Sequence, residues 1–204
     1  MAMKGTLYVI AAPSGAGKTT LVKALIDSLA DITVSISHTT RPKRPQEVHG
    51  VNYYFVDKPK FQRMIEAHDF LEHATVFDNL YGTSKSWVEN TLANGTDVIL
   101  EIDWQGHHQI KTLFPDTIGI FILPPSLDDL KSRLVTRNQD HPDIIEKRLL
   151  DAKETISHLN EFEYVVINDD LDRALHDLRA ILEANRLLAR RQAVKHAQLI
   201  ANFV

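Results

Sequence analysis

Short runs of continuous apolar residues alternate along the chain with longer stretches whose apolar residues recur at helical spacing. The continuous runs are rich in β-branched residues and span 6–12, 97–103, 118–124 and 164–168. Runs of this length without polar alternation are typical of strands in a parallel sheet that is covered on both faces. The stretches with helical spacing lie at about 18–30, 58–68, 84–94, 105–113, 127–137, 142–158 and 170–200. The pattern predicts an α/β fold in which a mostly parallel sheet lies between layers of helices.

Two segments do not fit the core of such a sheet. Residues 38–94 are rich in Arg, His, Tyr and Pro, and residues 127–157 are strongly charged. Neither composition suits a strand or helix that is buried on the sheet. We therefore predict that both segments are lobes inserted into a core that is built from 1–37, 95–126 and 158–204.

Two of the predicted helices begin with residues that are typical of helix N-termini. Ser126 precedes "LDDLKSRL" and can cap it, and Pro142 falls in the first turn of the next helix. The last helix has an apolar stripe that is expected to pack on the sheet, formed by Leu171, Leu175, Leu178, Ile181 and Leu182. The residues beyond it, 187–204, either dock on a second subunit as a homo-oligomer or extend without contact, and both alternatives stay open.

Composition narrows the class of protein. The 204 residues are 44% hydrophobic and 25% charged, with a formal net charge of −4, which suits one domain without the basic field that nucleic acid requires. The chain has no cysteine, which excludes disulfides, thiolate zinc sites and a cysteine nucleophile, and its ten histidines are scattered. The apolar runs are shorter than the roughly 20 residues of a membrane span, and no signal-peptide cleavage site follows the first run. We expect a cytoplasmic protein that binds neither nucleic acid nor membrane.

The segment "AAPSGAGKTT" joins the first predicted strand to the first predicted helix. It departs from the phosphate-binding pattern G-x-x-x-x-G-K-[ST] at Ala12, where the pattern has glycine. Gly15 and Gly17 supply the unhindered backbone of such a turn, whose N–H groups bind phosphate oxygens together with the helix N-terminus. Lys18 adds a charge for the β- and γ-phosphates, and the Thr19 hydroxyl can bind Mg²⁺. The loop predicts a bound nucleoside triphosphate, and Ala12 is tolerated if its φ is negative.

A second cationic element follows in "SHTTRPKRPQEVHGVNYYF". Arg41 and Arg44 lie three residues apart among prolines that keep the chain extended. Two guanidinium groups on a stiff loop suit a phosphate dianion, and Tyr53 and Tyr81 can add hydroxyl donors. A solvated basic turn has the same composition, so these residues alone leave both interpretations open.

These elements resemble those of bacterial guanylate kinases over nearly the whole chain. The resemblance is carried by "APSGAGKTT", "SHTTRPKRPQEVHGVNYYF", "FLEHATVFDNLYGTS", "ILEIDWQG", "FILPPS", the charged run ending "EKRL", and "VINDD", in that order. It implies a P-loop NTPase core, with 38–94 as the GMP-binding lobe and 127–157 as a lid. It also implies transfer of the γ-phosphoryl group of ATP to GMP and dGMP with Mg²⁺, giving a nucleoside diphosphate and ADP in purine nucleotide metabolism.

By this resemblance, Glu72 and Thr83 bind the guanine base, with Ser37 and Asp103 nearby. Guanine presents two donors, N1–H and the N2 amino group, beside the acceptor O6. A carboxylate can accept from both donors, and a hydroxyl can donate to O6. Adenine lacks this set, and a site built on specific hydrogen bonds can reject such an analogue by roughly 10⁴–10⁵.

The resemblance also assigns the GMP phosphate to Arg41, Arg44, Tyr53 and Tyr81, with Glu47 supporting their loop. Phosphoryl transfer depends on positioning and on neutralisation of charge, and the acceptor phosphate is already anionic, so no strong general base is required.

The remaining assignments concern the donor and the transferred group. The resemblance makes Arg137 and Arg148 the lid arginines, a kind of residue that can be worth roughly 10³–10⁵ in rate. Glu101 and Asp103 orient Mg²⁺-bound water and the acceptor, and Asn168 lies by the adenine. The loop residues expected to bind ATP are Ala12, Pro13, Ser14, Gly15, Ala16, Gly17, Lys18, Thr19 and Thr20. The groups expected to be catalytic are Lys18, Arg41, Arg137, Arg148 and Asp103.

Some positions depart from the family pattern. Gln46 replaces the glycine of "PGE", Leu80 replaces the first tyrosine of "NYYGT", and Asn138 replaces a glycine after Arg137. None of these changes removes an assigned charged or hydrogen-bonding group. The alternatives are a non-catalytic guanylate-kinase-like module that binds phosphopeptides and a P-loop kinase for another phosphorylated acceptor. A binding module does not need the ATP-binding loop, which this chain keeps. A kinase for another acceptor does not need Glu72 and Thr83 to bind a guanine base.

Overall fold

The computed structural model describes residues 3–76, 78–136 and 142–203, with no account of the side chains of 142–144. Its main sheet is five-stranded and parallel, in the order β2-β7-β1-β8-β9. These strands are β1 (Leu7–Ala11), β2 (Ile32–Val34), β7 (Asp97–Leu100), β8 (Ile118–Leu123) and β9 (Tyr164–Ile167). The parallel α/β fold predicted from the sequence is confirmed, and β2 is a further strand that the sequence did not reveal.

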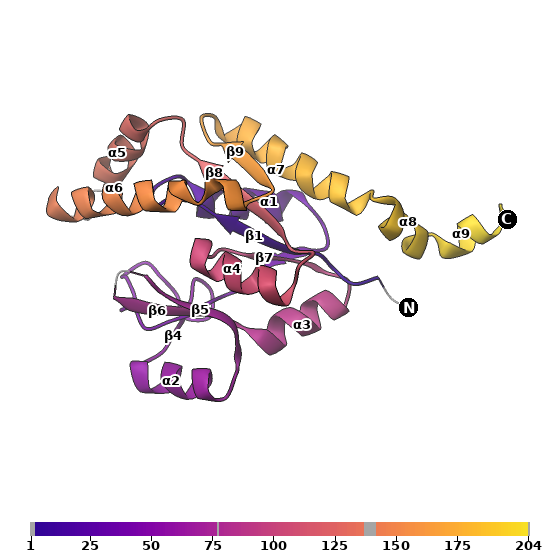
Figure 1. Ribbon diagram of the computed structural model, residues 1–204, viewed down its shortest axis with the longest axis horizontal. Coiled ribbons are helices and arrows are strands. Elements are labelled where there is room, and N and C mark those ends of the chain that lie inside the picture. Colours follow the sequence, from indigo (N-terminus) through magenta and orange to yellow (C-terminus); the bar gives the residue numbers. More distant parts are fainter. Residues whose placement is uncertain (1–2, 77, 137–141, 204) are drawn as a thin grey trace.

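Alternation along β1 explains the layers on both sides of this sheet. Tyr8 and Ile10 join one buried cluster, whereas Leu7, Val9 and Ala11 join the other. Helices α1 (Lys18–Ser28) and α7 (Leu171–Arg186) contribute to the first cluster. Helices α3 (Lys85–Ala93) and α4 (Trp104–Leu113) contribute to the second, and lie below the sheet in Figure 1. The central strand is therefore covered on both faces, as its continuous apolar run predicts.

A smaller sheet, in the order β4-β3-β6-β5, lies within the segment 38–94 and stands at the lower left in Figure 1. Its strands are β3 (His38–Thr39), β4 (Tyr54–Phe55), β5 (Phe70–Val76) and β6 (Asn79–Ser84). Helix α2 (Lys58–Glu66) flanks it, and the ring of Phe61 packs on Phe70 with centroids 4.5 Å apart. The sequence pattern predicts no strands here, because β3 and β4 are only two residues long and β5 carries polar residues on both faces.

Two helices follow β8. Helices α5 (Leu127–Thr136) and α6 (Pro142–Ser157) share a small buried cluster of Leu130, Leu134 and Ala152. The Ser126 hydroxyl accepts a hydrogen bond from the Asp129 backbone N–H at 3.0 Å, which confirms the predicted cap. Pro142 begins α6, also as predicted. The short 3₁₀ helix η1 (Leu159–Glu161) then leads into β9. The division of the chain into a core, an acceptor lobe and a lid stays a prediction.

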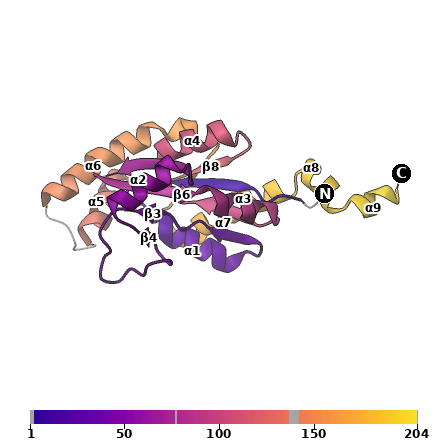
Figure 2. The same ribbon diagram turned by 90° about the horizontal axis from the view of Figure 1, so that it is seen from below.

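The single helix predicted over 170–200 is wrong. Helix α7 ends at Arg186 and is followed by α8 (Ala189–Lys195) and α9 (Ala197–Ala201), which extend away from the sheet (Figures 1 and 2). Leu178 and Leu182 are buried as predicted, but Leu171 is 43% exposed. The buried stripe begins at Ala174, one turn later, because Leu171 is the first residue of the helix. No helix in the described part of the chain has the length and apolarity needed to cross a membrane.

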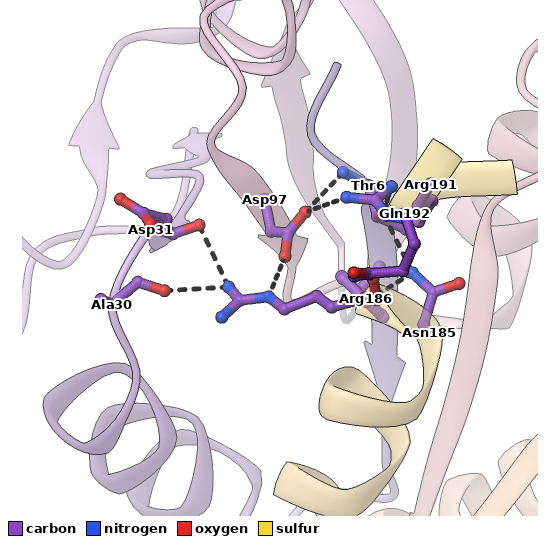
Figure 3. Close-up of polar contacts among 9 residues, drawn as sticks. Thr6, Ala30, Asp31, Asp97, Asn185, Arg186, Arg191 and Gln192 are labelled. Atoms are coloured by element: carbon purple, nitrogen blue, oxygen red, sulfur yellow. Dashed lines mark hydrogen bonds and ion pairs between the residues drawn. The ribbon is translucent and has the colours of Figure 1, made fainter. Parts of the chain in front are cut away.

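A buried ionic network fixes the end of α7 to the amino-terminal edge of the main sheet (Figure 3). The Asp97 carboxylate accepts from the backbone N–H of Thr6 at 2.6 Å and from Nε of Arg186 at 2.9 Å. Arg191, on α8, lies 3.6 Å from the same carboxylate. Arg186 also donates to the carbonyl of Ala30 at 2.9 Å. Breaking such a pair would leave a buried charge uncompensated, so this network holds α8 in a defined position.

Candidate functional site

The loop between β1 and α1 has the backbone geometry of a phosphate-binding turn. Gly15 and Gly17 adopt φ of +93° and +91°, a region that glycine occupies without strain. Gly17 directly precedes α1 and no side chain caps that helix, so its first N–H groups face the loop. Ala12 is not among the described residues with positive φ, so it meets the condition under which alanine was predicted to be tolerated. Within the loop, the Ala16 N–H donates to the Pro13 carbonyl at 3.1 Å.

Two side chains from later elements support this loop. The buried Asn168 amide donates to the Ala16 carbonyl at 2.6 Å. Arg133, on α5, donates to the Asn168 carbonyl at 2.9 Å and to the Ala16 carbonyl at 3.4 Å. A Cβ at Gly17 would lie 2.4 Å from the Asn168 amide nitrogen and would displace it, and the φ of +91° is one that side chains rarely adopt, so glycine suits this position. The sequence predicted Asn168 beside adenine, but it gave no role to Arg133, which lies four positions before Arg137 in the charged segment.

A cavity of about 530 Å³ opens beside the supported loop. Its wall includes Gly15, Gly17 and Thr20 from the loop and the start of α1, Arg133 from α5, and Asn168 from the end of β9. Pro13 is buried and Ser14 is partly buried. The loop, α5 and the residues after β9 thus border one open pocket beside the phosphate-binding turn.

A cluster of charged groups lies where β1 and β7 end. Burial lowers the pKa of the Lys18 amine, and the carboxylates of Glu101 and Asp103 oppose this effect. The Thr19 hydroxyl donates to Glu101 at 3.2 Å. Asp103 caps α4 by accepting from the Gly106 N–H at 2.9 Å, which fixes its carboxylate. The strand predicted over 97–103 ends at residue 100 because these last residues leave the sheet to form the cluster.

The predicted phosphate-binding arginines are held by Glu47. Its Oε1 accepts from Nη2 of Arg41 at 2.6 Å, and its Oε2 accepts from the backbone N–H of Arg44 at 2.8 Å. Burial alone would lower the pKa of Arg41, but Glu47 and Tyr81 raise it, so the guanidinium is charged. Its guanidinium carbon also lies 5.5 Å from the centre of the Tyr53 ring. Glu47 therefore supports the arginine loop.

Two tyrosines complete this part of the site. The rings of Tyr53 and Tyr81 lie 5.9 Å apart at their centroids. Burial, with the nearby Tyr81 and the charge of Glu101, raises the pKa of Tyr53 to about 12. The Tyr53 phenol is therefore a hydrogen-bond donor at neutral pH.

Glu72 and Thr83 pair across β5 and β6 and are both buried, with relative exposures of 3% and 0%. The Thr83 hydroxyl donates to Oε1 of Glu72 at 2.5 Å. Burial and then Asp103 raise the pKa of Glu72 to about 7, against the hydrogen bond from Thr83. A Cβ at Gly106 would lie 2.8 Å from Oε2 of Glu72, so this carboxylate touches the start of α4. The Thr83 hydroxyl has a single hydrogen, which it donates to Glu72. To donate to a bound base, the hydroxyl must rotate so that this hydrogen points away from Glu72.

The other predicted residues occupy the borders of this site. Ser37 lies between the two sheets, where its carbonyl accepts from the Tyr54 N–H at 2.9 Å. Arg148 lies on α6, partly buried, and its charge acts on Asp151 of the same helix. Arg137 lies outside the described residues. The structure thus brings together the loop, the carboxylates after β7, the arginine loop and the Glu72–Thr83 pair.

Comparison with known proteins gives one consistent family. A family model described as guanylate kinase matches residues 4–185. The chain is 56% identical over 204 residues to a guanylate kinase of Alcanivorax borkumensis, covering 100% of this chain and 99% of that protein. It is 52% identical over 201 residues to a guanylate kinase of Coxiella burnetii, covering 98% of each. The crystal structure of a guanylate kinase from Anaplasma phagocytophilum matches with a TM-score of 0.79 and 31% identity, over 93% of this chain and 90% of that one.

Proposed function

The chain belongs to the guanylate kinase family, and we propose that it transfers the γ-phosphoryl group of ATP to GMP, giving ADP and GDP, through the residues described above. Family membership makes the chain an enzyme that acts on nucleotides. The observation that carries the residue assignment is the buried Glu72–Thr83 pair, which lies against the start of α4 beside Asp103. A carboxylate and a hydroxyl in one buried pair suit the donors and the acceptor of a guanine edge.

The proposed acceptor site has a base end and a phosphate end. Glu72 and Thr83 bind the guanine, with Ser37 at the edge of the pocket. The phosphate lies against Arg41, Arg44, Tyr53 and Tyr81, and Glu47 keeps the two arginines in place. Two guanidinium groups and two phenols match the geometry and charge of a phosphate dianion. Asp103 and Glu101 lie at the end of β7, where donor and acceptor phosphates would meet.

The proposed donor site is the supported loop. The backbone N–H groups at the start of α1 and in the loop before it, where Pro13 has none, bind the triphosphate together with the ammonium group of Lys18, and Asn168 fixes the loop backbone beside the adenine. The Thr19 hydroxyl and the Glu101 carboxylate are adjacent hard oxygen donors, the kind that Mg²⁺ prefers. These two side chains would hold the ion directly or through water, with further ligands from ATP. When bound, Mg²⁺ neutralises charge on the phosphate oxygens.

We assign residues 38–94 to a GMP-binding lobe and 127–157 to a lid on the core formed by 1–37, 95–126 and 158–204. The separate sheet of β3–β6 supports the first assignment. The cluster shared by α5 and α6, apart from the two clusters of the main sheet, supports the second. Arg148 of α6 and Arg137 are the proposed lid arginines.

The proposed site also supports a second acceptor, a metabolic role and a cellular location. None of the acceptor residues is assigned to the ribose, which supports dGMP as a second acceptor. The product GDP belongs to purine nucleotide metabolism, and ATP and GMP are cytoplasmic substrates, which supports a cytoplasmic location. We propose no role for nucleic acid or membrane, since the phosphate-binding groups gather in one nucleotide-sized site.

We also propose that α8 and α9 join copies of the chain into a homo-oligomer. These helices extend beyond the sheet (Figure 2). Their segment exposes large apolar side chains, among them Leu187 at 68%, Leu199 at 55% and Phe203 at 81%. Apolar side chains that gather on one projecting segment are typical of an interface.

A coupled assay of ADP release tests the central proposal. With ATP and Mg²⁺, we expect turnover with GMP and dGMP, and kcat/KM at least 10³-fold lower with AMP or UMP, because neither adenine nor uracil presents the adjacent pair of donors that Glu72 accepts from guanine. A Lys18→Ala variant is the blank for contaminating kinases. Equal rates with GMP and AMP would contradict the proposal.

A further inference from the structure

The hydrogen bond inside the Glu72–Thr83 pair runs from the hydroxyl to the carboxyl group. Oγ1 of Thr83 donates its hydrogen to Oε1 of Glu72 at 2.5 Å, and the two residues face each other across β5 and β6. Because its hydrogen is used in this way, the hydroxyl oxygen can only accept from any further partner. In this arrangement Thr83 has the opposite polarity to the one that O6 of guanine needs.

Oε2 of Glu72 is the second polar atom that the pair can offer to a base. It lies at the start of α4, where a Cβ on Gly106 would come within 2.8 Å of it. When the carboxyl group is ionised, Oε2 only accepts hydrogen bonds. When the group is protonated and Thr83 still donates to Oε1, the hydrogen lies on Oε2, which then donates. One proton therefore decides whether the pair presents an acceptor or a donor at this atom.

The two forms of the pair match two different purines. Guanine presents the acceptor O6 beside the donor N1–H, which requires a donating hydroxyl and an ionised carboxylate. Adenine presents the donor N6 amino group beside the acceptor N1, which is the reverse polarity at the same two positions. A protonated Glu72 can donate to N1, and the Thr83 hydroxyl can accept from N6 while it still donates to Glu72. The hydrogen bond of the structure is thus kept in the adenine arrangement.

The surroundings of Glu72 bring both forms within reach near neutral pH. Burial and then Asp103 raise the pKa of Glu72 to about 7, against the hydrogen bonds from Thr83. Asp103 faces Glu72 from the start of α4, and it also opposes the lowering of the Lys18 pKa by burial. Three further ionisable residues on α3 and β5 are exposed to solvent, which screens their charge: Lys85, Glu89 and His73.

We propose that the Glu72–Thr83 pair selects the acceptor base by its protonation state: the ionised pair binds GMP, and the protonated pair binds AMP as a second phosphoryl acceptor. This inference rests on the proposed function, which supplies the ATP site and the site for the acceptor phosphate. In the transfer to AMP, the bond between the γ-phosphorus of ATP and its bridging oxygen to the β-phosphorus breaks. A bond to an oxygen of the AMP phosphate forms, and two ADP result. The proton of Glu72 takes no part in this step.

The preference for GMP over AMP then changes with pH in a way that does not depend on the pKa. The ratio of ionised to protonated pair rises about tenfold for each unit of pH. If each form accepts one base, the ratio of kcat/KM for GMP to that for AMP rises by the same factor. Both nucleotides carry the same phosphate and use the same ATP site, so the titrations of those groups cancel in the ratio. We therefore expect the ratio to fall about 100-fold from pH 8 to pH 6, with GMP still favoured at pH 8.

Variants separate the pair from other groups that titrate. The amide of Glu72→Gln donates through its nitrogen and accepts through its oxygen at every pH, so its GMP-to-AMP ratio should not change with pH. Glu89→Gln removes an exposed carboxylate from α3 and should keep the change of the parent chain. Lys18→Ala, purified in the same way and assayed at each pH, is the blank for contaminating AMP kinases.

Proton exchange on binding tests the inference without turnover. GMP displaces the proton of the protonated pair, whereas AMP requires a proton on the ionised pair. The two fractions add to one at every pH, so proton uptake with AMP should exceed that with GMP by about one proton per chain. Titration calorimetry at pH 7 in two buffers of different ionisation enthalpy measures this number for each nucleotide. The phosphates contribute equally, and the difference should vanish in Glu72→Gln.

Three results would overturn the inference. They are a GMP-to-AMP ratio that is constant between pH 8 and pH 6, equal proton exchange with the two nucleotides, and a pH dependence that persists in Glu72→Gln. An AMP that neither binds nor reacts at pH 6 would give the first of these results. Failure of the proposed function has a different signature, because a chain could bind both nucleotides with the expected difference in protons and phosphorylate neither.

Discussion

Glu72 shows how one buried group can favour a ligand at the expense of stability. Its carboxylate is almost fully buried, and its hydrogen-bond donor is Thr83, through the hydroxyl and the backbone. An ionised carboxylate in such a place loses its hydration, which is why burial raises its pKa to about 7. The N1–H and N2 donors of guanine would restore hydrogen bonds to the ionised form. The residue is thus better satisfied in the complex than in the chain alone.

Because burial disfavours the ionised form of Glu72, the stability of the folded chain should depend on pH, and Glu72→Gln should remove this dependence. The ordinary pKa of this side chain is 4.5 and the folded value is about 7, so between these pH values the folded chain holds a proton that the unfolded chain has released. The free energy of unfolding therefore falls as pH rises from 4.5 to 7, by on the order of 3 kcal/mol. Glu72→Gln removes this loss, so we expect the variant to be more stable than the parent at pH 8 and equal to it at pH 4.5. Urea unfolding at both pH values measures it.

The control is Glu66→Gln, an exposed residue of α2, which should leave stability unchanged at both pH values. The same Glu72→Gln protein should lose preference for GMP over AMP by roughly 10- to 100-fold, the worth of a hydrogen bond to a charged group. Equal stability of Glu72→Gln and the parent at pH 8 would show that burial does not destabilise the ionised carboxylate of Glu72.

At the scale of elements, the sequence predicts those strands whose residues are buried along their whole length. The central strand β1 and its neighbours β7 and β8 are covered on both faces, so continuous apolar runs identify them. The edge strand β9 also has an apolar run, but three of its four residues are exposed, so its predicted burial is wrong. The strands β3 and β4 are two residues long, too short for any periodicity to appear. The break after α7 at Arg186 is also invisible, because it depends on a side-chain network with Asp97, 89 positions away.

The same distinction holds for the elements of the site. The loop before α1 is a local pattern, and its glycine conformations follow from the pattern. Arg133 supports that loop from a residue 117 positions away, and His158 meets Trp104 only after the chain has formed α6 and returned. Such contacts have no local signature. The Glu72–Thr83 pair was identified through resemblance to a family, not through spacing.

The turn between β9 and α7 supplies a prediction about the loop. Asn168→Ala removes a buried hydrogen bond to Ala16, worth roughly 1–2 kcal/mol, so we expect KM for ATP to rise about tenfold with KM for GMP unchanged. Steady-state kinetics with ATP and with GTP as donors separates two roles. Support of the loop predicts the same rise for both donors, whereas a contact with adenine alone predicts a rise for ATP only. Asn90→Ala on α3 is the matched control.

At the scale of the whole molecule, the two edges of the main sheet carry different tasks. The phosphate loop, Glu101 and Asp103 lie at the carboxyl ends of the strands, as is typical of α/β proteins. Asp97 and its arginines lie at the opposite edge and fix the start of the projecting α8 and α9 (Figures 1 and 3). An interface formed by those helices would therefore leave the nucleotide site accessible.

This arrangement makes assembly separable from catalysis. Phe203→Ser together with Leu199→Ser removes two of the exposed apolar side chains, each worth roughly 1–2 kcal/mol if buried at an interface. We expect sedimentation equilibrium to give a mass of at least two 23.1 kDa chains for the parent, and an association about 100-fold weaker for the variant. Turnover per chain should be retained. Leu113→Ser, an equally exposed residue at the end of α4, should not weaken association. A parent chain that sediments as a monomer at micromolar concentration would contradict the interface, and the apolar surface of α8 and α9 would then need another partner.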